Sequence, residues 1–211
     1  MRILFPAAAF LITTVLSACS LRTIAVRTTA KLLVRGASAF YEEPDPGHAQ
    51  NAMAGQLKLL EALLKNDLKN PGLLTSLAEG YTGYAFLFFE DAEPERAKGF
   101  YRRAAGYGLR LLGRGRLAGI EGLKPKAMKE ALAKARAKDV PGLYWTAYAW
   151  AGWTNLDKNN PEALAVLPKA ARFMERVLEL DGGYQYAGSD VFFGVYYAGR
   201  PKIAGGDPER G

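Results

Sequence analysis

Aromatic side chains gather in two stretches of the second half of the chain, and they are the residues best suited to binding a small molecule. Tryptophan and tyrosine line apolar ligand cavities well, because each combines a large ring with one polar atom. An arginine in the same region can bind a carboxylate through two parallel hydrogen bonds. The sequence therefore indicates a candidate ligand or partner pocket. Its residues are Trp145, Tyr148, Trp153, Tyr184, Tyr186, Phe192, Tyr196 and Arg200.

The same residues also have a purely structural interpretation. Aromatic rings of this kind pack well as core between adjacent helical hairpins. Arg200 follows a stretch with helical spacing and can donate hydrogen bonds to the last carbonyls of that helix. The sequence leaves core packing and ligand binding open.

Residue sets for catalysis or metal binding are missing from the sequence. His48 is the only histidine and Cys19 the only cysteine, so neither a His/Cys metal site nor an internal disulfide is supported. A Ser-His-Asp triad would have to use His48, and no nucleophile elbow accompanies it. The run Gly205-Gly206-Asp207 is too short for a phosphate-binding loop. The sequence predicts a protein that is not an enzyme, with no catalytic residue, metal or cofactor.

The N-terminal stretch predicts export and lipid attachment. Residues 3–16 are apolar, too few to span a bilayer, and lead into Leu16-Ser17-Ala18-Cys19. That run resembles the bacterial lipobox, in which the cysteine is lipidated and becomes the mature N-terminus. We expect residues 1–18 to be a lipoprotein signal peptide and Cys19 to carry the lipid; the alternative is an ordinary secretory signal cut elsewhere. Ser20 favours the outer membrane, facing the periplasm.

Composition limits the class of protein and its partners. The chain has 211 residues, 49% of them hydrophobic, which suits one folded domain with a sizeable core. Its formal net charge of +7 fits an anionic lipid, an acidic protein face or an anionic solute. No nucleic-acid motif is present, so nucleic acid is not expected as a partner. The basic residues 124–138 are either a solvated surface helix or a contact for a membrane surface or acidic partner.

Apolar residues at helical spacing predict an all-α fold built from helix pairs. The central pair lies in residues 140–181, where the polar turn Asp157–Pro161 supplies a stop, an N-cap and a first-turn proline. The first helix of this pair is apolar on every face, so we expect it to be buried on most sides. Further helices are predicted over residues 21–41, 48–69, 73–90, 95–112, 124–138 and 189–197.

The recurring helix pairs resemble tetratricopeptide repeats. Ala97, Tyr101 and Ala104 match the small, aromatic and small positions of the second helix of that repeat, and residues 170–177 match less closely. Self-similarity of this kind implies a stacked solenoid. We therefore expect a right-handed α-α superhelix of divergent tetratricopeptide-like pairs, interrupted by residues 124–138.

Most of the chain resembles the TRAP transporter T-components (TatT), a family of periplasmic tetratricopeptide-like lipoproteins. The sharpest features are the lipobox at Cys19 and residues 190–207, where an aromatic helix precedes Arg200-Pro201 and a Gly-Gly-Asp helix start. The resemblance implies an all-α fold, a homo-trimer and association with the periplasmic solute-binding protein of a TRAP transporter. The family continues with another helix beyond the Gly-Gly-Asp start, whereas this sequence stops at Gly211. We therefore expect one domain over residues 19–211 that lacks a final helix.

These features together predict a non-catalytic lipoprotein that serves TRAP-type solute uptake. It would dock the solute-binding subunit and bind a small organic solute. The alternative is a general tetratricopeptide scaffold in cell-envelope assembly. An envelope enzyme is a third class, for which the sequence offers no set of acid, base and nucleophile.

Overall fold

The computed structural model describes residues 24–36, 39, 42–200, 202 and 206–209. Within these ranges the chain is helical and contains no strand, which confirms the all-α class. The chain divides into two compact units, Met1–Leu73 and Leu74–Gly211. The superhelical arrangement and the single domain over residues 19–211 stay predictions. No helix of the described ranges is both long enough and apolar enough to cross a membrane.

The first unit contains a helix over residues 24–35 and helix α3, Pro46–Leu64. Asp45 caps α3 by accepting a hydrogen bond of 2.9 Å from the backbone N–H of His48, and Pro46 occupies the first turn. Three leucines of α3 at helical spacing are buried, namely Leu57, Leu60 and Leu64. An ion pair of 3.0 Å between Arg27 and Asp67 joins the segment before α3 to the one after it.

Helix α4, Pro71–Phe88, continues into the second unit, where its aromatic residues pack against α5, Pro94–Leu112. The ring of Phe100 in α5 lies 5.1 Å from Tyr84 and 6.0 Å from Tyr81, measured between centroids. Arg103 donates a hydrogen bond of 3.0 Å to the Tyr81 hydroxyl. Edge-to-face and stacked rings of this kind hold the two helices together beyond simple area burial.

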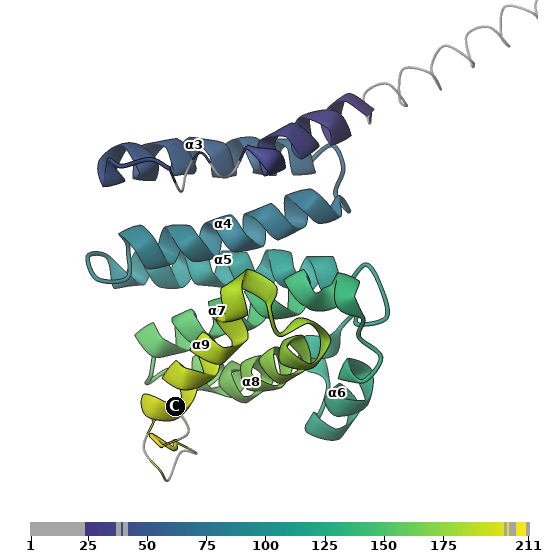
Figure 1. The fold of residues 1–211 in the computed structure, drawn as a ribbon, viewed down its shortest axis with the longest axis vertical. Helices are drawn as coiled ribbons and strands as arrows, with labels where there is room; N and C mark the ends of the chain where they lie inside the picture. The colour runs from purple at the N-terminus through teal and green to yellow at the C-terminus, as the bar shows by residue number, and fades with distance from the viewer. Residues whose placement is uncertain (1–23, 37–38, 40–41, 201, 203–205, 210–211) are drawn as a thin grey trace, which may run out of the picture. The chain divides into compact units, whose positions relative to one another are not determined.

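Helix α7, Val140–Leu156, lies at the centre of the second unit. It packs against α5 and α8 (Pro161–Asp181) along its length and also contacts α9, Tyr184–Ala198 (Figure 1). Ten of its 17 residues are buried, so the prediction of a helix buried on most sides is confirmed. Helices α7 and α8 are joined by the predicted turn, in which Asn160 caps α8 through the Glu162 backbone N–H at 2.9 Å.

The contact between α5 and α7 depends on glycine. A Cβ atom on Gly152 of α7 would overlap the ring of Tyr101 in α5. At the other end of the contact, a Cβ atom on Gly108 of α5 would overlap the Thr146 hydroxyl of α7. The two backbones therefore approach more closely than side chains with a Cβ would permit.

A short segment between α5 and α7 contains the 3-10 helices η1 (Ile120–Gly122) and η2 (Ala137–Asp139) and the helix α6 (Pro125–Leu132). The expected helix over residues 124–138 is wrong in its second half, because α6 ends at Leu132. The guanidinium of Arg176 in α8 donates to the carbonyls of Ala133 and Ala135, at 3.3 and 2.9 Å. A side chain thus satisfies carbonyls that a longer helix would have bonded internally.

Trp150 tests whether α7 is the core of the second unit. Its side chain is 5% exposed and its ring lies 5.3 Å from Phe173 of α8. We expect Trp150→Ala to lower the free energy of unfolding by about 3–5 kcal/mol, as for other large aromatic-to-alanine changes in cores. Urea unfolding followed by circular dichroism measures the change. Leu164→Ala, at a position 47% exposed on α8, is the control and should cost less than about 1 kcal/mol. A loss this small for Trp150→Ala would contradict the core assignment.

Candidate functional site

Four aromatic residues come together where α7 meets the start of α9. The ring of Tyr144 lies 4.9 Å from Trp145, 5.8 Å from Tyr148 and 5.1 Å from Tyr184, between centroids. Trp145 and Tyr148 are 6.2 Å apart. We call these four residues the aromatic cluster. It unites three of the eight residues predicted from the sequence, and Tyr144 is the member that the predicted set lacked.

The start of α9 positions Tyr184 on this cluster through an unusual backbone turn. Gln185, Tyr186 and Ala187 have φ angles of 50°, 56° and 60°, in the left-handed region. Non-glycine residues rarely adopt this conformation, which costs about 1–3 kcal/mol at each position. Immediately after the turn, Gly188 lies against the Tyr144 hydroxyl, and a Cβ atom there would overlap it. The close packing of Gly188 on Tyr144 is one contact that holds the turn in place.

Electrostatics make the cluster a source of neutral hydrogen-bond donors. Burial raises the pKa of the Tyr144, Tyr148 and Tyr184 hydroxyls, and the nearby carboxylate of Glu79 adds to the rise at Tyr144 and Tyr184. The hydroxyls therefore stay protonated at neutral pH. The indole N–H of Trp145 is buried beside the Tyr184 hydroxyl and acts to lower the pKa of that hydroxyl, but its geometry falls short of a well-formed hydrogen bond with the described residues. This arrangement suits a hydrogen-bond acceptor on an apolar ligand.

Three other predicted residues form a separate group along α9. Phe192 and Tyr196 stack with their centroids 5.8 Å apart. The guanidinium carbon of Arg200 lies 3.8 Å from the Tyr196 ring centroid, in a cation–π contact. Arg200 is thus placed on Tyr196, and no ion pair to a carboxylate is described for it.

The last two residues of the predicted pocket lie apart from both groups. Trp153 is about two turns beyond Trp145 on α7, and its indole N–H donates to Asp157 at 3.3 Å. Tyr186, at the tip of the left-handed turn, is 98% exposed. The predicted lipid-bearing Cys19 lies outside the described residues. The pocket as a single site of eight residues stays a prediction, and the structure gathers only part of it.

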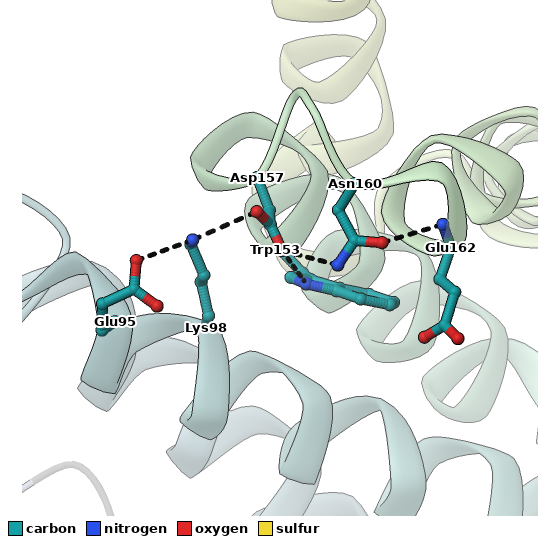
Figure 2. A network of polar contacts seen from close by, with 6 residues as sticks. All are labelled: Glu95, Lys98, Trp153, Asp157, Asn160 and Glu162. Carbon is teal, nitrogen blue, oxygen red and sulfur yellow. Dashed lines mark hydrogen bonds and ion pairs between the residues drawn. The ribbon is translucent and has the colours of Figure 1, made fainter.

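A polar network ties the first turn of α5 to the turn between α7 and α8 (Figure 2). The ammonium of Lys98 lies 2.8 Å from Glu95 and 3.1 Å from Asp157. The Asn160 side chain donates to Asp157 at 2.9 Å, in addition to capping α8. Sequence spacing identified Asp157 and Asn160 as turn residues, but it could not pair Asp157 with Lys98, 59 positions earlier.

This network is a structural clamp. Hydrogen bonds from Asn160 and then from Lys98 hold the pKa of Asp157 below its ordinary value. Hydrogen bonds to Glu95 and then to Asp157 raise the pKa of Lys98. Lys98 and Asp157 are therefore both stabilised in their charged forms, as in an ordinary ion pair. Neither group has a pKa near neutral pH, which a general acid or base would need.

The remaining chemistry-bearing residues show no catalytic or metal-binding arrangement in the parts of the chain that the structure describes. His48 is largely exposed, and its ring nitrogen Nε2 lies 3.8 Å from a carboxylate oxygen of Glu43. No group of three or more His, Cys, Asp or Glu side chains in these parts has the geometry to hold a metal ion.

The clamp predicts a pH-dependent contribution of Asp157 to stability. Because its folded-state pKa is depressed below 3.8, the contribution is fully present above that value and is lost as the pH falls through the folded-state pKa. We expect Asp157→Asn to be less stable than wild type at neutral pH, with the difference vanishing in strong acid. Urea unfolding over an acid-to-neutral pH series measures this. Glu175→Gln, an exposed change on α8, is the control. A difference that persists unchanged into strong acid would contradict the clamp.

Comparison with known proteins places the chain in a family. The sequence model of the TRAP transporter T-component family matches residues 42–211, which contain α3 to α9 and therefore the aromatic cluster and the clamp. No curated protein matches the chain. The match covers most of the chain and agrees with the resemblance seen at residues 190–207. The chain belongs to the TRAP transporter T-component family.

Proposed function

We propose that this protein is a lipid-anchored, non-catalytic component of TRAP-type solute uptake that docks the periplasmic solute-binding protein. Family membership over residues 42–211 is the observation that carries the proposal, because it associates the chain with a TRAP transporter and with the cell envelope. The transporter accessory role follows from the family; docking of the solute-binding protein is our proposal for how that role is performed.

The anchor is proposed at Cys19, after removal of residues 1–18 as a signal peptide. The mature chain, residues 19–211, would form one tetratricopeptide-like domain at the outer membrane, facing the periplasm. Anchoring confines the protein to the compartment of its partners and so raises their effective concentration. Stacked helix pairs curve into a concave face, which suits docking of a protein. We further propose a homo-trimer, whose mass light scattering can measure.

The solute is proposed to bind at the aromatic cluster. Its rings offer apolar contact, and the indole N–H of Trp145 offers a hydrogen-bond donor. The nearby carboxylate of Glu79 disfavours an anionic group at this place. We therefore propose a small organic solute whose uncharged, acceptor-bearing part contacts the cluster. A carboxylate, if the solute has one, would have to lie toward Arg200 or outside.

Lipid attachment predicts a simple outcome. Cells fed a labelled fatty acid should incorporate the label into wild-type protein, because the lipobox cysteine is the acceptor, and should lose it in Cys19→Ser. Gel fluorography of immunoprecipitated protein measures the label. Wild-type protein that is unlabelled and recovered free of membranes would contradict the anchor.

Docking is tested with an epitope-tagged chain recovered from detergent-solubilised native envelopes. Mass spectrometry should identify a TRAP solute-binding protein among the bound chains. Recovery of outer-membrane assembly proteins without any solute-binding protein would instead support the scaffold alternative.

The solute is tested in the same preparation, by identifying small molecules extracted from the purified protein. Trp145→Phe removes an indole donor of the cluster, so we expect it to lower the amount of bound solute by about tenfold or more, as for loss of one buried hydrogen bond. Trp153→Phe is the matched control, because Trp153 bonds Asp157 and lies outside the cluster. Equal solute content in both variants would remove the cluster from the proposal while leaving docking intact.

A further inference from the structure

The positive charge of the chain is concentrated in one segment. Residues 110–138 contain nine basic and two acidic side chains, a net charge of +7, equal to that of the whole chain. The other 19 basic and 19 acidic residues cancel. We call residues 110–138 the basic segment. Its basic residues, all of them exposed, are Arg110, Arg114, Arg116, Lys124, Lys126, Lys129, Lys134, Arg136 and Lys138.

The basic segment has a defined structure whose apolar side is already occupied. It comprises the end of α5, η1, α6 and the start of η2, and its large apolar side chains are buried, as Ile120 and Met128 are, or half-buried, as Leu111 and Leu123 are. Helix α8 holds its backbone from beneath, because Lys169 donates to the Glu121 carbonyl at 2.6 Å and Arg176 to the Ala135 carbonyl at 2.9 Å. The segment therefore presents charge to solvent from a fixed backbone, with no apolar face left for insertion into a bilayer.

The lysines of the basic segment form no ion pair with an acidic side chain in the parts of the chain that the structure describes. Lys124, Lys126, Lys129, Lys134 and Lys138 are exposed, and no ion pair is described for any of them. No large apolar side chain of the segment is exposed either. Protein interfaces are depleted of lysine at their centres and depend on buried aromatic or arginine anchors. An anionic bilayer surface requires only clustered positive charge.

We propose that the basic segment is a membrane-contacting surface that binds the phosphate headgroups of anionic phospholipids. Clusters of four to eight lysines and arginines bind anionic bilayers in this way, each contributing about fivefold to the partition coefficient. Family membership places the chain in the envelope, where such a surface is available. The contact would orient the second unit on the bilayer, independently of any acyl anchor and of solute binding.

The test is co-sedimentation with vesicles, using the full chain with Cys19→Ser in every arm so that no acyl group contributes. Vesicles of phosphatidylcholine with about 30% phosphatidylglycerol should bind the protein, since the charge attraction requires an anionic surface. Vesicles of phosphatidylcholine alone report any purely apolar association. Binding to the anionic vesicles should fall steeply with added salt.

Charge reversals locate the contact. Lys124→Glu, Lys126→Glu and Lys129→Glu together should lower the partition coefficient by about tenfold or more. Glutamate is favoured near the N-terminus of α6, where Lys124 and Lys126 lie, whereas Lys129 lies in the last turn, so circular dichroism has to confirm that the triple variant keeps its helix content. The control reverses three exposed lysines elsewhere, at Lys65, Lys69 and Lys158, and so reaches the same net charge. It should lower binding by less than about threefold.

A second variant guards against misfolding of the first. Lys134→Gln with Lys138→Gln lies beyond α6 and should lower binding by about fivefold or more, while circular dichroism stays unchanged. Equal losses in the basic-segment and control variants would overturn the proposal, as would absent binding or equal binding to neutral vesicles. The proposal would also be overturned if the charge-reversal variants still bound anionic vesicles but no longer captured an acidic protein. The basic segment would then be a surface for a protein partner.

Discussion

The burial of α7 is the constraint on which the rest of the second unit depends. A helix apolar on every face has to be covered on all sides, and α5, α8 and α9 together cover it. Close approach at Gly152 and Gly108 brings α5 against it, and the Asn160 cap returns the chain as α8 on another side. The Lys98–Asp157 contact then fixes the end of α7 relative to the start of α5.

The same helix places functional candidates on a rigid support. Trp150 and Phe173 form core contacts along one side of α7, whereas Trp145 and Tyr148 carry the aromatic cluster. Sites built on packed helices hold their geometry better than sites on loops. Only Tyr184 comes from a less regular place, the left-handed turn that opens α9. Three residues of the cluster thus have positions fixed by the packed helix α7, whereas the position of Tyr184 depends on the strained turn.

Local signals predicted much of this fold. The proline after the capping residue Asn160 predicted the start of α8, and the all-round apolar pattern correctly indicated a buried α7, whereas α3 begins at Pro46 and not at residue 48 as predicted. Long-range partners were beyond reach of spacing alone. The helix of residues 124–138 was extended too far because nothing local shows that Arg176, about 40 residues later, bonds its carbonyls. The eight pocket residues were grouped by nearness in sequence, but Trp145 and Trp153 are about 12 Å apart along the helix.

The proposed function depends most on direct contact between this chain and a TRAP solute-binding protein. Isothermal titration of the purified Cys19→Ser chain with the purified solute-binding protein of the same transporter tests that contact without other envelope components. We expect saturable binding. The variant Tyr186→Ala changes an exposed side chain, so the protein should stay folded and its binding should remain measurable. No detectable heat or complex at concentrations well above those in the periplasm would contradict it.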